Sequence, residues 1–244
     1  MARVVAITQA RMTSTRLPGK ILKTTRGKTL LEWHVERLKR CPLFSEVVIA
    51  TTVNATDDPV IAEAKRLGVR AHRGSEEDVL SRFIGAAKDS RPDIVVRVTS
   101  DCPLWDPAEG GRVVEGLMQD PPADYASNSF ERTYPRGLDT EALWYDVLLR
   151  MQRLAPQGQC PEREHVTIMI NASRRELFLR RSVATQTLGS DLRWCVDTPE
   201  DFACIDAIYK GLDDPLASYP AVLKFVRAHP EIAALNAAIE QKKV

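Results

Sequence analysis

Short apolar runs alternate with helix-period segments in the first part of the chain, and this alternation constrains the fold more than any other feature. The expected strands are Arg3–Thr8, Glu46–Thr51, Val69–His72 and Asp93–Thr99. The segments that favour helices are Lys28–Arg40, Pro59–Leu67 and Asp78–Asp89. Strands joined by helical crossovers run parallel, so the pattern predicts an α/β fold with a mostly parallel central sheet and helices on both faces.

The rhythm changes after about Gln119. The further strands expected are Ala123–Asn128, Leu138–Trp144 and Glu176–Val183, and Glu162–Ala172 favours a helix. We interpret residues 130–190, approximately, as a smaller α+β lobe inserted into a single domain that spans 1–244. After it we expect a strand at Arg193–Val196, a helix at Pro199–Lys210 and a helical tail, Ala221–Lys242, broken at Pro230.

Composition excludes several classes of protein. The net charge of +1 gives no global attraction to nucleic acid or to a membrane surface. The sequence contains no apolar stretch near the roughly 18 residues of a membrane span, no signal-peptide core and no aromatic and basic stripe suited to nucleic acid. Its five cysteines form no Cys-x-x-Cys pair, which argues against a disulfide framework or a zinc site. We therefore expect a cytoplasmic protein.

The loop Ala10–Lys20 directly follows the first expected strand, at the position where open α/β sheets bind ligands. Residues Met1–Arg40 hold ten Lys and Arg but two Asp and Glu, a local excess that suggests an anionic ligand. Arg11, Arg16 and Lys20 supply guanidinium and ammonium donors within the loop. The pattern favours a triphosphate site, with a solvated basic surface loop as the alternative.

Two better-known phosphate-binding patterns are absent. The segment Arg26–Thr29 ends like a P-loop, but that motif needs glycine at the position held by Leu22. The first strand-to-helix turn also lacks the glycine-rich fingerprint of dinucleotide-binding folds, so NAD and FAD are not expected.

Two aspartates are expected at the same sheet edge as this loop. Asp101 follows the expected strand Asp93–Thr99, and Asp197 follows the expected strand Arg193–Val196. Two carboxylates at this edge could hold Mg²⁺ against phosphate oxygens, because Mg²⁺ usually takes one or two protein carboxylates. The alternatives are structural: Asp101 in a simple turn, and Asp197 beside Thr198 at the start of a helix.

Six motifs then occur in an order that resembles one enzyme family. They are ITQARMTSTRLPGKIL at 7–22, RVTSDCPLWDP at 97–107, DYASN at 124–128, YPRGLDTEAL at 134–143, EREHVT at 162–167 and RWCVDTPEDF at 193–202. The chain resembles the cytidylyltransferases that activate acidic sugars, which include the acylneuraminate and 3-deoxy-manno-octulosonate enzymes and the SpsF group of spore coat polysaccharide proteins. This resemblance covers about the first 210 residues.

The resemblance implies a Rossmann-like nucleotidyltransferase fold and a reaction in which a sugar oxygen attacks CTP and pyrophosphate leaves. It implies Mg²⁺ as the cofactor, with Asp101 and Asp197 as metal ligands, and a homodimer formed through the inserted lobe. The implied catalytic residues are Arg11, Lys20 and Asp101. The implied nucleotide-binding residues are Ala10, Arg11, Thr13, Ser14, Arg16, Lys20 and Asp101.

An acidic sugar would also need a site. Arginine binds carboxylates through two parallel hydrogen bonds, so we expect Arg136 to hold the sugar carboxylate. Asp139 and Glu141 would accept hydrogen bonds from sugar hydroxyls, and the resemblance implies a substrate contact for His165. The alternative for these residues is a turn into a strand with surface charges, and for His165 a packed or surface position.

The chain departs from the family pattern at two positions. Relatives usually carry glycine where this chain has Thr13, and often where it has Ser100. Each change adds a side chain near the expected triphosphate or metal. A non-catalytic nucleotide-binding module, left after these changes, therefore stays open. A second alternative is a different transferase on a similar fold, such as a glycosyltransferase that uses a nucleotide-sugar donor. The second option is weakened because no Asp-x-Asp occurs, and Ser100-Asp101-Cys102 stands where one would be expected.

Overall fold

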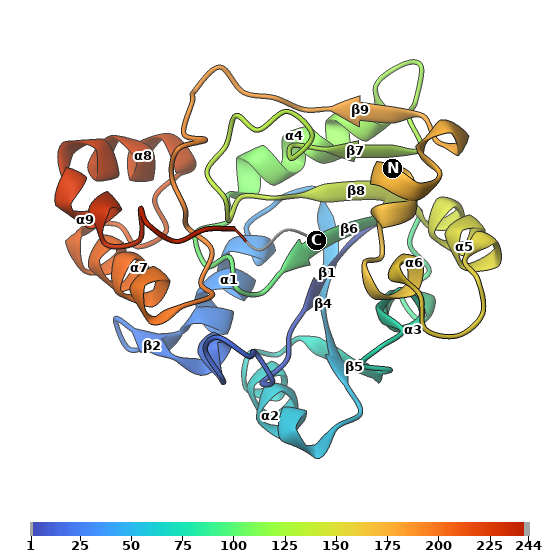
Figure 1. Ribbon diagram of the computed structural model, residues 1–244, viewed down its shortest axis with the longest axis horizontal. Helices are drawn as coiled ribbons and strands as arrows, with labels where there is room; N and C mark the ends of the chain where they lie inside the picture. Colours follow the sequence, from blue (N-terminus) through green and yellow to red (C-terminus); the bar gives the residue numbers. More distant parts are fainter. Residues whose placement is uncertain (1, 242–244) are drawn as a thin grey trace.

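The computed structural model describes residues 2–241 and is built around a seven-stranded sheet (Figure 1). Across the sheet the strands lie in the order β5-β4-β1-β6-β8-β7-β9. Their bounds are β1 Val4–Gln9, β4 Phe44–Thr52, β5 Arg70–Gly74, β6 Ile94–Thr99, β7 Tyr125–Ser127, β8 Glu141–Trp144 and β9 Arg180–Ser182. Strands β5, β4, β1 and β6 run parallel to one another. Strand β8 is antiparallel to β6 and β7, and β9 is parallel to β7. The predicted mostly parallel sheet is confirmed.

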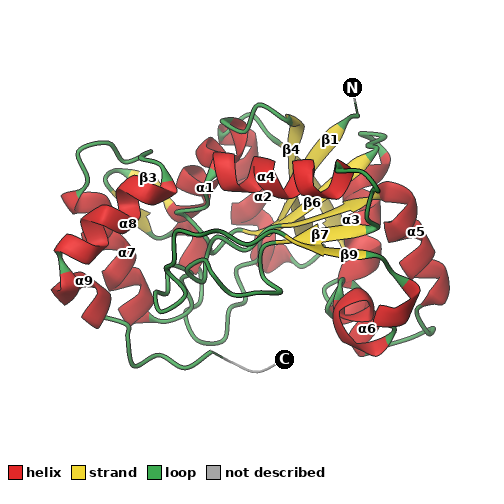
Figure 2. Ribbon diagram, turned by 90° about the horizontal axis from the view of Figure 1, so that it is seen from above, coloured by secondary structure: helices red, strands yellow, loops and turns green. Residues whose placement is uncertain are grey.

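Helices cover both faces of the sheet (Figure 2). The helices are α1 Leu30–Lys39, α2 Asp58–Arg66, α3 Val79–Lys88, α4 Pro107–Met118, α5 Tyr145–Leu154, α6 Pro161–Glu164, α7 Pro199–Gly211, α8 Tyr219–Ala228 and α9 Pro230–Ala234. One face packs against α3 and α5, and the other against α1, α2 and α4. Helices α7, α8 and α9 form a separate group with its own apolar core, to the left in Figure 1.

Side-chain caps fix where helices near the sheet edge begin. Asp78 accepts a hydrogen bond from the first turn of α3, and Asp106 does the same for α4. Thr198 and Asp201 form a capping box at the start of α7. Such caps satisfy backbone N–H groups that have no partner within the helix, so these residues define the loops that precede each helix.

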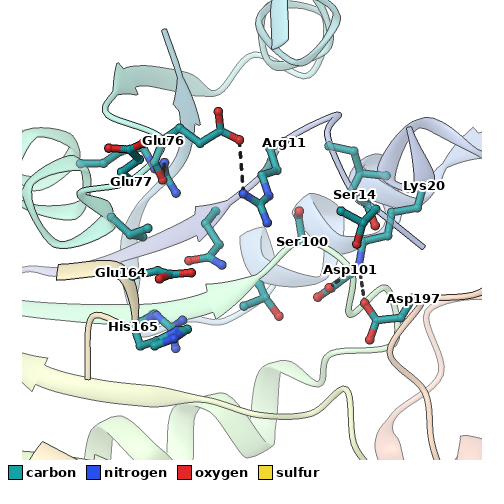
Figure 3. A pocket seen from close by; sticks show the side chains of 18 of the residues that line it. Arg11, Ser14, Lys20, Glu76, Glu77, Ser100, Asp101, Glu164, His165 and Asp197 are labelled. Atoms are coloured by element: carbon teal, nitrogen blue, oxygen red, sulfur yellow. Dashed lines mark hydrogen bonds and ion pairs between the residues drawn. The ribbon is translucent and has the colours of Figure 1, made fainter. Parts of the chain in front are cut away.

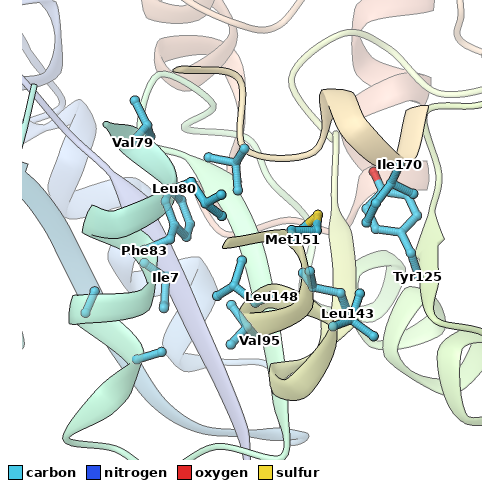
Figure 4. Close-up of a cluster of buried hydrophobic side chains, with 14 of the residues drawn as sticks. Ile7, Val79, Leu80, Phe83, Val95, Tyr125, Leu143, Leu148, Met151 and Ile170 are labelled. Carbon is cyan, nitrogen blue, oxygen red and sulfur yellow. The ribbon is translucent and has the colours of Figure 1, made fainter. Parts of the chain in front are cut away.

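The sheet face beneath α3 and α5 is apolar over most of its length. Ile7, Val95 and Leu143 come from three neighbouring strands, and they pack against Phe83 of α3 and Leu148 of α5 (Figure 4). All five side chains are buried. Because side chains alternate between faces along a strand, Gln9 and Arg97, two positions after Ile7 and Val95, lie on the same face.

The region predicted as an inserted lobe, approximately 130–190, supplies β8 and β9 to the main sheet. Its strands therefore continue the central sheet, and their bounds are shorter than predicted. The helix expected at Glu162–Ala172 is replaced by α6 and a π-helical segment, Met169–Ser173. A 3₁₀ turn at Arg175–Leu177 precedes β9.

Two other elements differ from the prediction. Lys28 belongs to a small hairpin of β2 (Thr24–Thr25) and β3 (Lys28–Thr29), so α1 begins at Leu30. The segment Arg193–Val196 is not a strand of the sheet and forms an isolated bridge between Arg136 and Arg193. The expected tail is helical in α8 and α9, and its last predicted residue, Lys242, lies outside the described residues.

No helix among residues 2–241 is long and apolar enough to cross a membrane.

Candidate active site

A cavity of about 770 Å³ opens at the carboxyl ends of β1 and β6 (Figure 3). One end, which we call the phosphate end, is lined by Ser14, Arg16, Lys20, Asp101 and Asp197. The opposite wall carries Glu164 and His165, which Figure 3 shows across the cavity from Lys20. Residues from three distant parts of the sequence thus meet at the sheet edge that the first loop was predicted to occupy.

Backbone contacts hold the loop Ala10–Lys20 against the sheet. Ala10 N donates to Ala50 O at 3.0 Å, and Gly19 N donates to Met12 O at 2.9 Å. Gly19 has a φ of 67°, a left-handed conformation that glycine adopts without steric cost. The chain therefore turns sharply at Gly19 and enters a 3₁₀ helix at Lys20, which directs the lysine side chain back into the cavity.

Lys20 binds both predicted aspartates. Its Nζ donates to Asp101 Oδ2 at 2.6 Å and to Asp197 Oδ1 at 2.8 Å. Burial alone would lower the pKa of Lys20, but the charges of Asp101 and Asp197 outweigh burial and raise that pKa above its usual value. Burial likewise opposes ionisation of Asp101, yet the charge of Lys20 lowers the Asp101 pKa to about 2. Lys20 and Asp101 are therefore both charged at neutral pH.

Asp197 is held from the opposite side by two arginines. Arg16 Nη2 and Arg193 Nη2 lie 2.8 and 2.7 Å from Asp197 Oδ2. Arg193 in turn donates to the buried Asp201, and Asn236 of the C-terminal segment donates to Asp201 at 2.9 Å. The structural alternative for this motif is also observed, since Thr198 caps α7, but the Asp197 carboxylate remains directed at the cavity.

A buried histidine supports the loop that carries Asp101. His34 Nδ1 donates to Cys102 O at 2.8 Å, because a carbonyl oxygen can only accept. Its Nε2 then accepts from Thr8 Oγ1 at 3.0 Å, which is the neutral form of the ring. Burial lowers the His34 pKa to about 4. Sequence reasoning missed this residue, since a histidine within a helix has no local feature that marks it as a support.

Arg11 and Thr13 lie further from the phosphate end. Arg11 lines the cavity and forms an exposed ion pair with Glu76 at 3.4 Å. The Thr13 hydroxyl donates to the same carboxylate at 3.2 Å and does not line the cavity. The side chain at the position where relatives usually carry glycine thus contacts Glu76.

The side chains that the sequence predicted to bind the sugar lie in different parts of the structure. His165 lines the cavity, but Arg136 lines a second cavity of about 320 Å³ beside Arg193. Asp139 forms an ion pair with Arg132 outside the main cavity. Glu141 is buried, and its oxygens accept hydrogen bonds from protein groups. The structure therefore does not bring Arg136, Asp139 and Glu141 together with His165 at one site.

Three polar residues of the sheet line the same cavity and had not been singled out. Gln9 of β1 and Arg97 and Thr99 of β6 share the face that carries Ile7 and Val95, and we call them the cavity floor. The alternation of side chains along Ile94–Thr99 could have placed Arg97 on this face only once the face of Val95 was known.

The phosphate end suits a divalent metal. Asp101 and Asp197 offer carboxylate oxygens that already converge on one cation, the Lys20 ammonium. Among residues 2–241 no group of three or more His, Cys, Asp or Glu side chains could hold a metal ion. A donor set of two carboxylates fits Mg²⁺, whose remaining positions are usually filled by water and phosphate oxygens.

Comparison with known proteins identifies a family for the chain. The cytidylyltransferase family model matches residues 5–182. The chain is 32% identical over 247 residues to the spore coat polysaccharide biosynthesis protein SpsF of Bacillus subtilis, which covers 96% of this chain and 98% of SpsF.

Solved structures show the same likeness. A cytidylyltransferase from Leptospira borgpetersenii has a TM-score of 0.91 and 32% identity, covering 99% of this chain and 100% of that chain. CMP:2-keto-3-deoxy-manno-octonic acid synthetase, solved with CTP, has a TM-score of 0.64 and 22% identity over 86% of this chain and 99% of its own. At that lower identity the likeness shows the fold alone, and it confirms the predicted nucleotidyltransferase architecture.

Proposed function

The chain belongs to the cytidylyltransferase family, and from this we propose that it transfers CMP from CTP to an acidic sugar of the keto-acid type. The observation that carries the proposal is the contact of Lys20, at the end of the loop Ala10–Lys20, with both Asp101 and Asp197. This contact places cationic and anionic groups together where a triphosphate and its metal would meet.

In the proposed reaction a sugar hydroxyl oxygen forms a bond to the α-phosphorus and releases its proton. The bond from that phosphorus to the bridging oxygen breaks, and pyrophosphate leaves. Arg16 and Lys20 would hold the charged phosphate oxygens, with the Ser14 hydroxyl and loop N–H groups as further donors. These residues act by position and charge, which is the main contribution that proteins make to phosphoryl transfer.

Asp101 and Asp197 would hold Mg²⁺ at the phosphate end. The ion would neutralise charge that develops on the α-phosphate and on the leaving pyrophosphate. The residues around the pair orient both carboxylates: Lys20 contacts both, and Arg193 contacts Asp197 from the opposite side.

The acidic sugar is supported by relatives. SpsF is named for spore coat polysaccharide biosynthesis, and the synthetase solved with CTP is named for a keto-deoxy sugar acid. We therefore propose that the product serves cell-surface or spore-coat polysaccharide biosynthesis. The far wall of the cavity, with Glu164 and His165, leaves room for such a sugar beyond the phosphate end.

We also propose that the chain forms a homodimer through the region 130–190. Leu177, Leu179 and Leu188 are exposed large hydrophobic residues of this region, and β9 lies at the edge of the sheet beside them. An unpaired strand edge next to exposed leucines is a surface that proteins normally cover.

The test is pyrophosphate release with Mg²⁺ and each of the four nucleoside triphosphates. The acceptors are 3-deoxy-manno-octulosonate and N-acetylneuraminate, each assayed alone. We expect release with CTP and at least one acceptor, loss of activity in EDTA, and a drop on the order of 100- to 1,000-fold in Asp101→Asn. Asp213→Asn, at an exposed position in the loop after α7, is the matched control and should keep wild-type turnover.

Two results would contradict the proposal. Tight CTP binding by calorimetry, without pyrophosphate from any acceptor, would indicate a non-catalytic nucleotide-binding module. Sugar release from a nucleotide-sugar donor, without pyrophosphate formation from CTP, would indicate a glycosyltransferase.

A further inference from the structure

The cavity floor begins where an apolar sheet face becomes polar. Val95 of β6 is fully buried, Arg97 follows it on the same face, and Thr99 follows at the strand end. On the neighbouring β1, Gln9 is the register partner of Thr99. An arginine on a face otherwise packed with Ile7 and Val95 loses hydration, so its position calls for a compensating partner or ligand.

Glu141 supplies the compensation and fixes the orientation of Arg97. The two residues are register partners on β6 and β8, and Arg97 Nη1 donates to Glu141 Oε2. Glu141 Oε1 accepts from Tyr125 Oη at 2.5 Å and from Thr167 Oγ1 at 2.7 Å. Arg97 Cζ also lies 5.8 Å from the centre of the Phe83 ring. Glu141 is thus fully engaged by protein groups, and its role is to position Arg97.

Arg97 retains donors that the protein does not use. Its side chain is 20% exposed and lines the cavity, and Nη2 donates to none of the residues 2–241. Nε is buried without a hydrogen-bond partner in the same part of the chain. A guanidinium that is fixed on one edge and free on another is suited to bind a planar anion, because little side-chain freedom remains to be lost.

A second floor atom also lacks a partner. Gln9 Oε1 is buried and accepts no hydrogen bond from the described residues, although Gln9 lines the cavity. A buried acceptor without a donor costs free energy until a ligand supplies one. The floor therefore offers a cationic donor and, one strand away, a neutral acceptor. This pairing matches a sugar acid, which carries both a carboxylate and hydroxyl groups.

Arg97 lies on the strand that leads to the phosphate end. Arg97 precedes Asp101 by four residues, so at most roughly 13 Å of extended chain lies between their backbones. The phosphate end already has Arg16 and Lys20 for the phosphates. At this separation the Arg97 charge can serve a molecule bound against the α-phosphate, beside the phosphates assigned to Arg16 and Lys20.

On the proposed function as premise, we propose that Arg97, positioned by Glu141, binds the carboxylate of the acceptor sugar. Arg97 Nη2 donates to the carboxylate, and Gln9 Oε1 accepts from a sugar hydroxyl. The residue expected from sequence for this task, Arg136, lies in the second cavity. The enzyme then selects acidic over neutral sugars through Arg97 of β6, whose side chain is oriented by Glu141.

The experiment compares each sugar acid with its methyl ester, which keeps the ring and removes the charge. The probes are 3-deoxy-manno-octulosonate and N-acetylneuraminate, with pyrophosphate release as the readout and saturating CTP. In the wild type we expect kcat/KM for the acid to exceed that for the ester by roughly 100-fold. In Arg97→Gln this preference should vanish, because kcat/KM falls for the acid and stays unchanged for the ester. The loss should appear mainly in the KM for the sugar.

Three controls give the comparison its meaning. Arg153→Gln, on the exposed side of α5, should keep the wild-type preference. CTP affinity by calorimetry should be unchanged in Arg97→Gln, since the proposal assigns Arg97 to the sugar. Arg82→Gln tests another arginine of the cavity, whose Nη1 donates to Ser75 O and so holds a loop of the cavity.

Arg97→Gln leaves Glu141 buried without its cation and could impair folding. The paired variant Arg97→Gln/Glu141→Gln removes both charges and should fold, with the same loss of acid preference. Arg97→Lys keeps the charge without the planar fork and should restore part of the preference.

Several results would overturn the proposal while cytidylyl transfer stands: an acid preference that persists in Arg97→Gln and in the paired variant, its loss in Arg82→Gln instead, or a weakened CTP affinity with the preference intact. A wild type that binds CTP but releases no pyrophosphate with either acid would overturn the proposed function, and this inference with it.

Discussion

At the phosphate end, one ammonium serves two carboxylates from distant parts of the chain. Lys20 carries out this role only because Gly19 turns the backbone and His34 holds the loop of Asp101 from below. The neutral state of His34 matters, since a charged ring would have to be buried beside the cationic Arg37.

The first prediction concerns His34 and pH. Its pKa is about 4 in the folded chain and near 6.5 when exposed, so the unfolded chain takes up a proton first as pH falls. Stability is therefore fully present above pH 6.5 and is lost towards pH 4, by roughly 2 to 3 kcal/mol. Urea unfolding at pH 7 and pH 4.5 measures this loss.

In His34→Asn the loss over this range should shrink by that amount, because the amide does not titrate and can still donate to Cys102 O. His229→Asn, near the end of α8, is the control and should keep the wild-type pH dependence. An unchanged pH dependence in His34→Asn would show that His34 is not the group responsible.

Local motifs were enough to predict the loop, Asp101 and Asp197 as neighbours, because each follows a strand or a bridge segment that ends at one sheet edge. Arg97 and Gln9 were not predicted as cavity residues. Their common position in the cavity depends on the register between β1 and β6, which the sequence alone does not show. Arg136, which its motif indicated as the ligand of the sugar carboxylate, lines the second cavity and not the one that holds Lys20 and His165.

At the scale of elements, the backbone around Arg136, between β7 and β8, lies directly against the backbone of Leu192 and Trp194, which precede α7. Arg136 N donates to Leu192 O, and Trp194 N donates to Arg136 O at 2.6 Å. Gly137 has a φ of 111°, and a Cβ at this position would lie 2.6 Å from the backbone carbon of Trp194. The crossing therefore requires glycine on two grounds, conformation and space.

The second prediction follows from this crossing. Gly137→Ala should lower the free energy of unfolding by roughly 2 to 4 kcal/mol, because strain and a backbone clash add. Gly158→Ala is the matched control: its φ of 84° is also left-handed, but nothing lies within 4 Å of the added methyl. It should cost about 1 kcal/mol, by conformation alone. Equal losses in the two variants would mean that the close approach contributes nothing.

The first four parallel strands were predictable because each apolar run is bounded by turn residues and separated by a helical period. The hairpin of β2 and β3 was missed because its turn, Arg26-Gly27, has positive φ at both residues, 47° and 79°, a geometry usually marked by Asn-Gly or Asp-Gly. Arg193–Val196 looked like a strand because it contains the apolar residues Trp194 and Val196, yet these residues pack in the helical group of α7 and α8.

At the scale of the whole molecule, the sheet has two edges, β5 and β9. The edge at β9 lies beside Leu179, which is 68% exposed. The third prediction is that Leu179→Ser shifts the protein from twice the mass of one chain to a single chain, because it removes an apolar contact at the proposed interface.

Size-exclusion chromatography with light scattering measures the change. Val53→Ser is the control, since Val53 is 62% exposed but follows β4, away from the region 130–190. A wild type that elutes as a single chain at micromolar concentration would refute the dimer, and a dimer that persists in Leu179→Ser would move the interface elsewhere.

The order of strands has a consequence for how the chain folds. β8 lies between β6 and β7, although β7 comes first in the sequence, so β7 has no neighbour on that side until β8 arrives. The four parallel strands, by contrast, are complete once residues 4–99 are in place. We expect the sheet to grow outward from this half. The contact between Arg97 and Glu141 would then form only when β8 joins β6. The cavity floor would therefore be completed after the parallel half of the sheet during folding.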